Sequence, residues 1–363
     1  MKRMKRLWIG GLAVLLWVGM ACADQVDTLL EDLASGDKNK QVVAAVLLKK
    51  FRDPRVAQAA IVRAGDAGTP LAVRKPCIQL IRDQRIEAGL ETLLKIAQNV
   101  EEPFAVRGPA IYGLVDLSGS KHVELLLKFI REDKSENVKR SAATALGATK
   151  DAKVAPKALE LLDDPKTARY GLIAISIMGE KSAVPKLVKL LKTDDQNLRY
   201  TVIDALGELA DKRAVAPMLE LYDGDENPHQ RGLILRAFGK IDDPQVVSKL
   251  SALAGDKKNS QNVRTVALLS IGELKAKGAL SVVSAVASGP TEQVILRQVA
   301  TRQLGKLGDE AIPTLISLLD DKAVASDAAL SLRQVTGVYF GVDRARWTAF
   351  YKEYKKRKER QPQ

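Results

Sequence analysis

The chain has 363 residues, two cysteines and a formal net charge of +13. Residues 1–23 carry +4 and residues 351–363 carry another +4, which leaves about +5 on the long stretch between them. So small a charge on the body argues against a nucleic-acid-binding domain, and two cysteines cannot build a disulfide framework. The length fits two ordinary domains or one long array of repeats.

The first 23 residues have the pattern of a secretory signal peptide. Basic residues at positions 2–6 precede the uncharged stretch LWIGGLAVLLWVGM, and Ala21-Cys22-Ala23 supplies an A-x-A cleavage site. We expect cleavage after Ala23 and export to the periplasm or cell envelope. A lipoprotein anchored at Cys22 is the alternative, although Gly19 stands where that motif normally has leucine.

From about Lys40 onward the chain repeats a frame of about 32 residues. In LRYTVIDALGELADKRAVAPMLEL, residues 198–221, apolar residues follow helical spacing on both sides of a break at Asp211. Equivalent basic residues, 30–33 positions apart, mark eight copies: Arg74, Arg107, Lys139, Arg169, Arg199, Arg231, Arg264 and Arg297. A helix pair per copy predicts an all-α fold, a right-handed α-α superhelix of about nine or ten helix pairs.

Two further residue types recur in the frame. An aspartate closes the break in several copies, at Asp53, Asp151, Asp211, Asp243 and Asp309, where it can cap the next helix. Glycine recurs within the preceding helix, at Gly147, Gly207, Gly239, Gly272 and Gly305. Because glycine costs helix propensity, these positions predict a close approach between neighbouring helices.

The frame V-R-x-x-A-x-x-A-L-G-x-L-x-D-x-x-A-V-x-x-L resembles the HEAT-like repeats first recognised in bilin lyases. The copy at 198–221 matches it through Leu198, Arg199, Ala205, Leu206, Gly207, Leu209, Asp211, Ala214 and Val215. The resemblance covers roughly residues 38–335, so we divide the chain into a signal peptide (1–23), a repeat array (24–335) and a C-terminal segment (336–363). In repeats of this type a helix arginine commonly pairs with the turn aspartate of a neighbouring repeat. The resemblance therefore implies a structural ladder formed by Arg199, Asp211, Arg231, Asp243 and Arg264.

The C-terminal segment is similar to the end of many exported bacterial HEAT-repeat proteins. The similarity lies in Thr336, Gly337, Phe340, Gly341, Asp343 and Trp347. An exposed solenoid end needs a cover, and we expect an aromatic cap from Tyr339, Phe340, Trp347, Phe350 and Tyr351. The basic run that follows is interpreted as a solvated helix end. Membrane contact is expected only through this tail or a lipidated Cys22.

Motifs that carry chemistry are scarce in this sequence. His122 and His229 stand apart from other probable metal ligands, and the paired His-Glu motifs of HEAT-repeat deoxyhypusine hydroxylases are missing. Cys77 shares its frame position with Ala142, Val202 and Ala267, which favours a buried small hydrophobe over a reactive thiol. We expect no metal and no cofactor.

The binding face is expected where the frame points away from the apolar stripe. The third and seventh frame positions lie one helical turn apart, and they supply six candidate protein-binding residues: Arg140, Tyr170, Tyr200, Asp204, Arg236 and Arg302. Tyr170 and Tyr200 hold the same position in successive copies, so their rings should be neighbours. The alternative is that these tyrosines lie flat over the stack and cover apolar surface.

Two functions fit this sequence. The first is a non-catalytic scaffold of the bacterial cell envelope that binds a protein partner along the concave face. The second is an enzyme or enzyme subunit similar to bilin lyases, which would handle a chromophore or another small molecule. Nucleic acid is not an expected partner.

Overall fold

The computed structural model describes residues 25–224 and 226–360, and the expected signal peptide with Cys22 lies outside them. Within these residues the chain is built from α-helices and short 3-10 turns, with no β-strand. The helices α2 to α21 give ten successive pairs in chain order. An all-α solenoid with nine or ten helix pairs was therefore the correct prediction.

The chain divides into two compact units, one ending at Met178 and one beginning at Gly179. The first unit starts with a helix over residues 25–34. Its other helices are α2 (Lys38–Leu47), α3 (Pro54–Gly65), α4 (Leu71–Asp83), α5 (Leu90–Gln98), α6 (Phe104–Ser118), α7 (Val123–Glu132), α8 (Glu136–Ala148), α9 (Ala155–Glu160) and α10 (Ala168–Met178).

The second unit continues the same alternation. Its helices are α11 (Val184–Leu190), α12 (Gln196–Leu209), α13 (Val215–Gly224), α14 (Pro228–Phe238), α15 (Pro244–Gly255), α16 (Gln261–Leu274), α17 (Leu280–Ser288), α18 (Val294–Leu304), α19 (Ile312–Ser317), α20 (Ala325–Thr336) and α21 (Arg344–Arg360).

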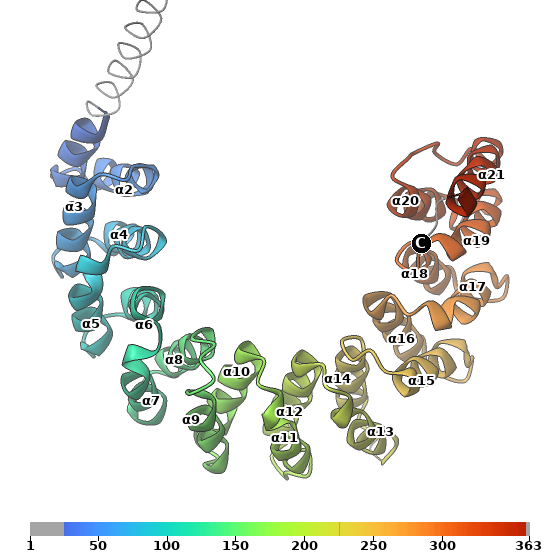
Figure 1. Ribbon diagram of the computed structural model, residues 1–363, viewed down its shortest axis with the longest axis horizontal. Coiled ribbons are helices and arrows are strands. Elements are labelled where there is room, and N and C mark those ends of the chain that lie inside the picture. The colour runs from blue at the N-terminus through green and yellow to red at the C-terminus, as the bar shows by residue number, and fades with distance from the viewer. Residues whose placement is uncertain (1–24, 225, 361–363) are drawn as a thin grey trace, which may run out of the picture. The chain divides into compact units, whose positions relative to one another are not determined.

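Each unit has two layers of helices (Figure 1). The even-numbered helices pack side by side in one layer, α2 to α10 in the first unit and α12 to α20 in the second. The odd-numbered helices form the other layer, where α3 packs on α5 and α15 on α17. Between the layers lies the apolar core, which includes Ala142, Val202 and Ala267, each without exposed surface.

The frame glycines lie where neighbouring even-numbered helices touch. A Cβ built on Gly207 would stand 2.8 Å from the Cβ of Ala237 on α14, and one on Gly305 would stand 2.9 Å from the Cβ of Ser331 on α20. Gly147, Gly239 and Gly272 face α10, α16 and α18 in the same way. The prediction of close helix approach is confirmed.

Four of the five turn aspartates cap the following segment. The carboxylates of Asp53, Asp211 and Asp243 accept hydrogen bonds from backbone N–H groups two residues on, at 2.8–2.9 Å, and Asp151 does the same for Lys153. Asp309 was predicted wrongly. It lies inside a short 3-10 turn, and its carboxylate accepts from the Tyr354 hydroxyl at 3.0 Å and pairs with Lys358 of α21.

The C-terminal helix α21 packs against α19 and carries most of an aromatic cluster. Trp347 is fully buried, its indole N–H donates to the Gly341 carbonyl at 2.9 Å, and its ring lies 4.9 Å from that of Phe340 and 6.0 Å from that of Phe350. The prediction of an aromatic cap is thus correct for these three residues. Tyr339 is 56% exposed, so its inclusion was wrong. Tyr354, which was not predicted, contacts the Phe350 ring.

Candidate functional site

The side of the even-numbered helices that points away from the apolar core, here called the outward face, carries most of the predicted binding residues. Arg140 on α8, Asp204 on α12, Arg236 on α14 and Arg302 on α18 are exposed, and Tyr200 on α12 is partly exposed. Equivalent positions in the frame have the same helical phase, because the contact glycines fix the register of each helix against the next. In the second unit the face therefore presents Tyr200, Asp204, Arg236 and Arg302 on three helices of one layer.

Tyr170 is buried, so the prediction that it is exposed was wrong. The residue is only 2% exposed, its hydroxyl bonds the carboxylate of Glu136, and the Arg169 guanidinium lies 4.9 Å from its ring centre. Burial, followed by this hydrogen bond, raises the pKa of the Tyr170 hydroxyl above its usual value. At Tyr170 the alternative expectation, in which the tyrosine ring lies over the stack and covers apolar surface, is the correct one. The repeat that contains Tyr170 departs from the other copies, since Arg169, at the basic position, is exposed and Ala168 beside it is buried.

Tyr200 has the accessible setting that was expected. Its hydroxyl accepts a hydrogen bond from the Asn227 side-chain amide at 3.1 Å, and its ring meets the exposed His229 ring edge-on at 4.8 Å between centres. Tyr170 and Tyr200 belong to different units, so their neighbouring arrangement stays a prediction.

The basic positions form a different structure from the predicted ladder. In four copies a buried arginine donates through Nε to the carbonyl ten residues earlier, at 2.8–3.1 Å, and its guanidinium pairs with an acid in the loop before the next repeat. We call these four arrangements the buried clamps: Arg74–Glu102, Arg107–Asp133, Arg264–Glu292 and Arg297–Asp321. Each clamp satisfies a carbonyl at the end of one odd-numbered helix and fixes the next loop.

The clamps show a clear electrostatic effect. The two guanidinium nitrogens of Arg264 lie 2.6 and 2.9 Å from the Glu292 carboxylate oxygens, a bidentate pair in which both side chains are less than 10% exposed. Hydrogen bonding from Arg264 lowers the pKa of Glu292, and Arg297 lowers that of Asp321. Both acids therefore stay charged in the folded chain.

The predicted ladder is wrong in its partners. Arg264 pairs with Glu292 and not with a turn aspartate, while Arg199 donates to the Gln230 side chain and the Thr193 carbonyl, and Arg231 to the Tyr222 carbonyl. Asp211 pairs with Arg213 in its own turn, and Asp243 serves as a cap. The reason is position along the helix, because these arginines lie near the helix start, beside the end of the preceding helix and the loop between repeats, and away from the turn within a repeat.

The clamp acids were missed, although the sequence holds a signal for them. Glu102, Asp133, Glu292 and Asp321 follow their arginines by 24–28 residues. That variable separation crosses a whole helix pair, so a search for fixed spacing overlooks it.

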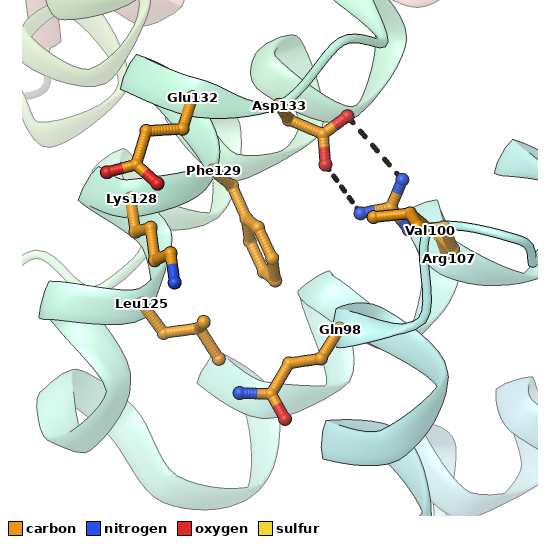
Figure 2. Close-up of a pocket in the computed structure, with 8 residues that line it drawn as sticks. All are labelled: Gln98, Val100, Arg107, Leu125, Lys128, Phe129, Glu132 and Asp133. Carbon is orange, nitrogen blue, oxygen red and sulfur yellow. Dashed lines mark hydrogen bonds and ion pairs between the residues drawn. The ribbon is translucent and has the colours of Figure 1, made fainter.

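A pocket of about 400 Å³ opens beside one clamp (Figure 2). Its walls come from α7, through Leu125, Lys128, Phe129 and Glu132, and from Gln98 and Val100 at the end of α5 and the loop after it. The Arg107–Asp133 pair lines it as well, with the guanidinium 5.9 Å from the Phe129 ring centre. Its lining combines the apolar side chains of Val100, Leu125 and Phe129 with the charged side chains of Lys128 and Glu132.

A second pocket of about 530 Å³ lies in the other unit at the same place in the frame. It is lined by Val188, Leu191, Lys192, Arg199, Pro217, Glu220, Leu221 and Gly224. Arg199 holds the position that Arg107 holds in the first pocket. Recesses of this kind thus belong to the repeat, which makes them weak indicators of a special site.

Cys77 is a core residue, as predicted. It is 1% exposed, and burial raises the pKa of its thiol to about 12. Among the described residues no group of three or more His, Cys, Asp and Glu side chains could hold a metal ion. The described helices also include none with the length and apolar character of a membrane span.

Comparison with known proteins identifies the repeats. A family model described as HEAT repeats matches residues 90–178, 164–228 and 184–267, and one described as PBS lyase HEAT-like repeat matches 296–321. A HEAT repeat-containing taxis protein of Halobacterium salinarum is 26% identical over 168 residues, which are 39% of this chain and 40% of that protein. The chain thus spans less than half the length of this relative.

Solved structures show the same fold at low identity. Yeast importin-β (Kap95p) matches with a TM-score of 0.56 at 15% identity, over 92% of this chain and 52% of importin-β. A second importin-β structure gives 0.53 at 12% identity, over 90% and 54%. The phycocyanin lyase complex of Nostoc sp. PCC7120 matches at 0.36 and 16% identity, over 77% and 94%, which is too distant to bear on function. The chain is accordingly an α-solenoid that contains HEAT repeats over residues 90–267 and a HEAT-like repeat at 296–321.

Proposed function

We propose that this protein is a non-catalytic scaffold that binds a partner protein on the outward face of its even-numbered helices. The single observation that carries the proposal is the set of polar residues in register on one face of the second unit, the partly exposed Tyr200 and the exposed Asp204, Arg236 and Arg302. Tyrosine and arginine are the side chains most enriched at the energetic centres of protein interfaces. A solenoid offers such residues along an extended surface.

The location of this activity is part of the proposal. The signal-peptide pattern of residues 1–23 supports export, and we propose the periplasm or cell envelope of a bacterium as the place where the partner is met. Cleavage after Ala23 and lipidation at Cys22 predict different N-termini, so the mass of the mature protein separates them.

Native mass spectrometry of the protein purified gently from its own envelope fraction tests the proposal. We expect a stoichiometric protein partner that is lost when Tyr200, Asp204, Arg236 and Arg302 are all replaced by alanine. Tyr170 is left unchanged, because its ring is buried and its replacement would leave a cavity and remove the hydrogen bond to Glu136. As a control, alanine at the exposed Lys153, Lys212, Lys258 and Glu87 should leave the complex intact.

A different result would redirect the interpretation. A bound pigment or small molecule, with no protein partner, would support the alternative of a bilin-lyase-like enzyme or subunit and overturn the scaffold. A complex that survives the four substitutions would place the binding surface elsewhere.

A further inference from the structure

Four residues on successive even-numbered helices of the second unit form a line that alternates in chemistry. They are Arg236 on α14, Leu269 on α16, Arg302 on α18 and Leu330 on α20, here called the strip. Each stands directly before a residue that contacts a glycine of the preceding even-numbered helix, namely Ala237, Ser270, Gln303 and Ser331. These shared contacts fix the four strip residues in the same register.

The strip is open to solvent. Leu269 is 43% exposed, Leu330 is 54% exposed, and the Arg302 side chain is 54% exposed. Arg236 is exposed and makes no ion pair or side-chain hydrogen bond within the part of the chain that the structure describes. Arg302 has one acid nearby, Asp327 of α20, at 3.8 Å. Two cations and two large apolar side chains are thus available to a partner.

The charges one turn further along the same helices are already paired. Lys240, in the turn after α14, pairs with Glu208 of α12, and Lys306, in the turn after α18, pairs with Glu273 of α16 at 2.9 Å. On the other side of the strip lie neutral positions, Gly232, Thr265 and Gln298. The strip arginines therefore lie between a row of paired charges and an uncharged row, with Asp204 of α12 at the frame position before Arg236 and Asp327 at 3.8 Å from Arg302.

The general spacing of packed helices matches the repeat of one extended ligand conformation. Packed helices lie about 8–10 Å apart. A polyproline II segment repeats its side-chain direction every three residues and rises about 3.1 Å per residue, or about 9.3 Å per turn. A β-strand would instead turn every third side chain to the opposite face. A polyproline II segment laid across the helices can therefore offer one side chain to each strip residue.

We propose that the strip binds a polyproline II segment of a partner protein in which acidic and apolar residues alternate at every third position. The acids pair with Arg236 and Arg302, and the apolar residues contact Leu269 and Leu330. This inference rests on the proposed function and specifies its partner: acidic at the first and seventh positions of the segment, apolar at the fourth and tenth. Arginine pairs well with carboxylates in such contacts.

Fluorescence anisotropy with a labelled peptide tests this with the full mature chain. The probe is Glu-Pro-Pro-Leu-Pro-Pro-Glu-Pro-Pro-Leu, and the comparison peptide has the same composition with the acids and leucines grouped at its two ends. We expect the periodic peptide to bind at least about tenfold more tightly, a difference of about 1.4 kcal/mol.

Charge reversal locates the site. The double variant Arg236→Glu with Arg302→Glu should lose binding of the probe at least about tenfold and should gain binding of a peptide with lysine in place of both glutamates. The matched control is Lys212→Glu with Lys258→Glu, which makes the same charge change at exposed positions off the strip. Equal affinity for the two peptides, or equal losses in the strip and control variants, would overturn the proposal.

The outcome separates this inference from the scaffold itself. If the envelope partner depends on Tyr200, Asp204, Arg236 and Arg302 but the chain does not distinguish the two peptides, the scaffold stands and the periodic ligand is wrong. If the chain binds the periodic peptide more tightly but no partner protein co-purifies, the specificity of the strip stands and the proposal of an envelope partner is wrong.

Discussion

Helix α18 carries two arginines five residues apart that have opposite environments. Arg297 is 7% exposed, donates to the Ala287 carbonyl at 3.0 Å and pairs with Asp321. Arg302 is exposed, and its one acidic neighbour lies 3.8 Å away. Five residues of an α-helix turn through about 500°, which places the two side chains about 140° apart around the axis.

The same contrast between a buried clamp and the strip is found on α16. On α16, Arg264 is clamped by Glu292, and five residues later Leu269 faces solvent. The clamps hold successive repeats together, and the strip contributes no comparable contact. Arginine alone therefore does not indicate function; its phase on the helix and the acid that it reaches decide its role.

Removing a clamp should have the largest effect. Arg264→Ala would leave the Glu292 carboxylate, which has an 8% exposed side chain, with only the exposed Lys257 at 3.8 Å, and we expect a loss of about 3 kcal/mol in the free energy of unfolding of the second unit. Arg236→Ala should change it by less than about 0.5 kcal/mol. Urea denaturation followed by circular dichroism, with hydrogen exchange of α16 and α18, measures both. Similar values for the two variants would contradict the distinction between clamp and strip.

Two glycines test the same contrast between a packed and an open face. Gly207→Ala would bring its new Cβ to 2.8 Å from Ala237, and we expect a net destabilisation of about 1–2 kcal/mol after the gain in helix propensity. Gly232, within α14, has no heavy atom within 4 Å of the equivalent Cβ.

We therefore expect Gly232→Ala to stabilise the unit by about 0.5–1 kcal/mol. Thermal or urea unfolding of both variants under identical conditions supplies the comparison. A shift of the same sign in both would show that helix propensity, and not the helix contact, governs these positions.

The remaining expected effect is the acid dependence of the turn aspartate. Hydrogen bonding from the Arg213 side chain lowers the pKa of Asp211 from 3.8 to about 2. Between these values the unfolded chain binds more protons, so the carboxylate stabilises the fold above about pH 4 and loses this contribution as the pH falls through 2.

Asp211→Asn keeps a capping side chain but removes the charge. The difference in unfolding free energy between the native chain and Asp211→Asn should be constant above about pH 5 and should shrink towards zero near pH 2. Urea unfolding over that pH range measures it, with Asn227→Asp, at another helix cap, as a comparison. A difference that does not vary with pH would mean that Asp211 is not held charged by Arg213.

Most of the secondary structure was predictable because the signals are local. Apolar spacing, capping aspartates and recurring glycines all act within about one helix, so Asp53, Asp211 and Gly207 have the roles that their positions predict. The aromatic cap was predictable for Trp347 and Phe350, since large apolar side chains near the end of an array need cover.

The predictions that failed depended on contacts between distant positions. Tyr170 was assigned to the surface from its frame position, but its ring is buried and its hydroxyl bonds Glu136, 34 residues earlier. Asp309 was assigned as a cap, but α21 returns to bind it through Tyr354, 45 residues on. Only part of the strip could be predicted from the sequence, because Leu330 lies outside the regular spacing of the frame.

The sequence by itself determined an array of paired helices, their turns and the phase of their apolar faces, because these depend on neighbours within one or two helical turns. Only the tertiary structure decided which arginines became buried clamps and which stayed open. The reason is that a guanidinium is satisfied by whichever carbonyl and carboxylate packing brings within about 3 Å, and those partners come from the preceding helix and from a loop 24–28 residues away.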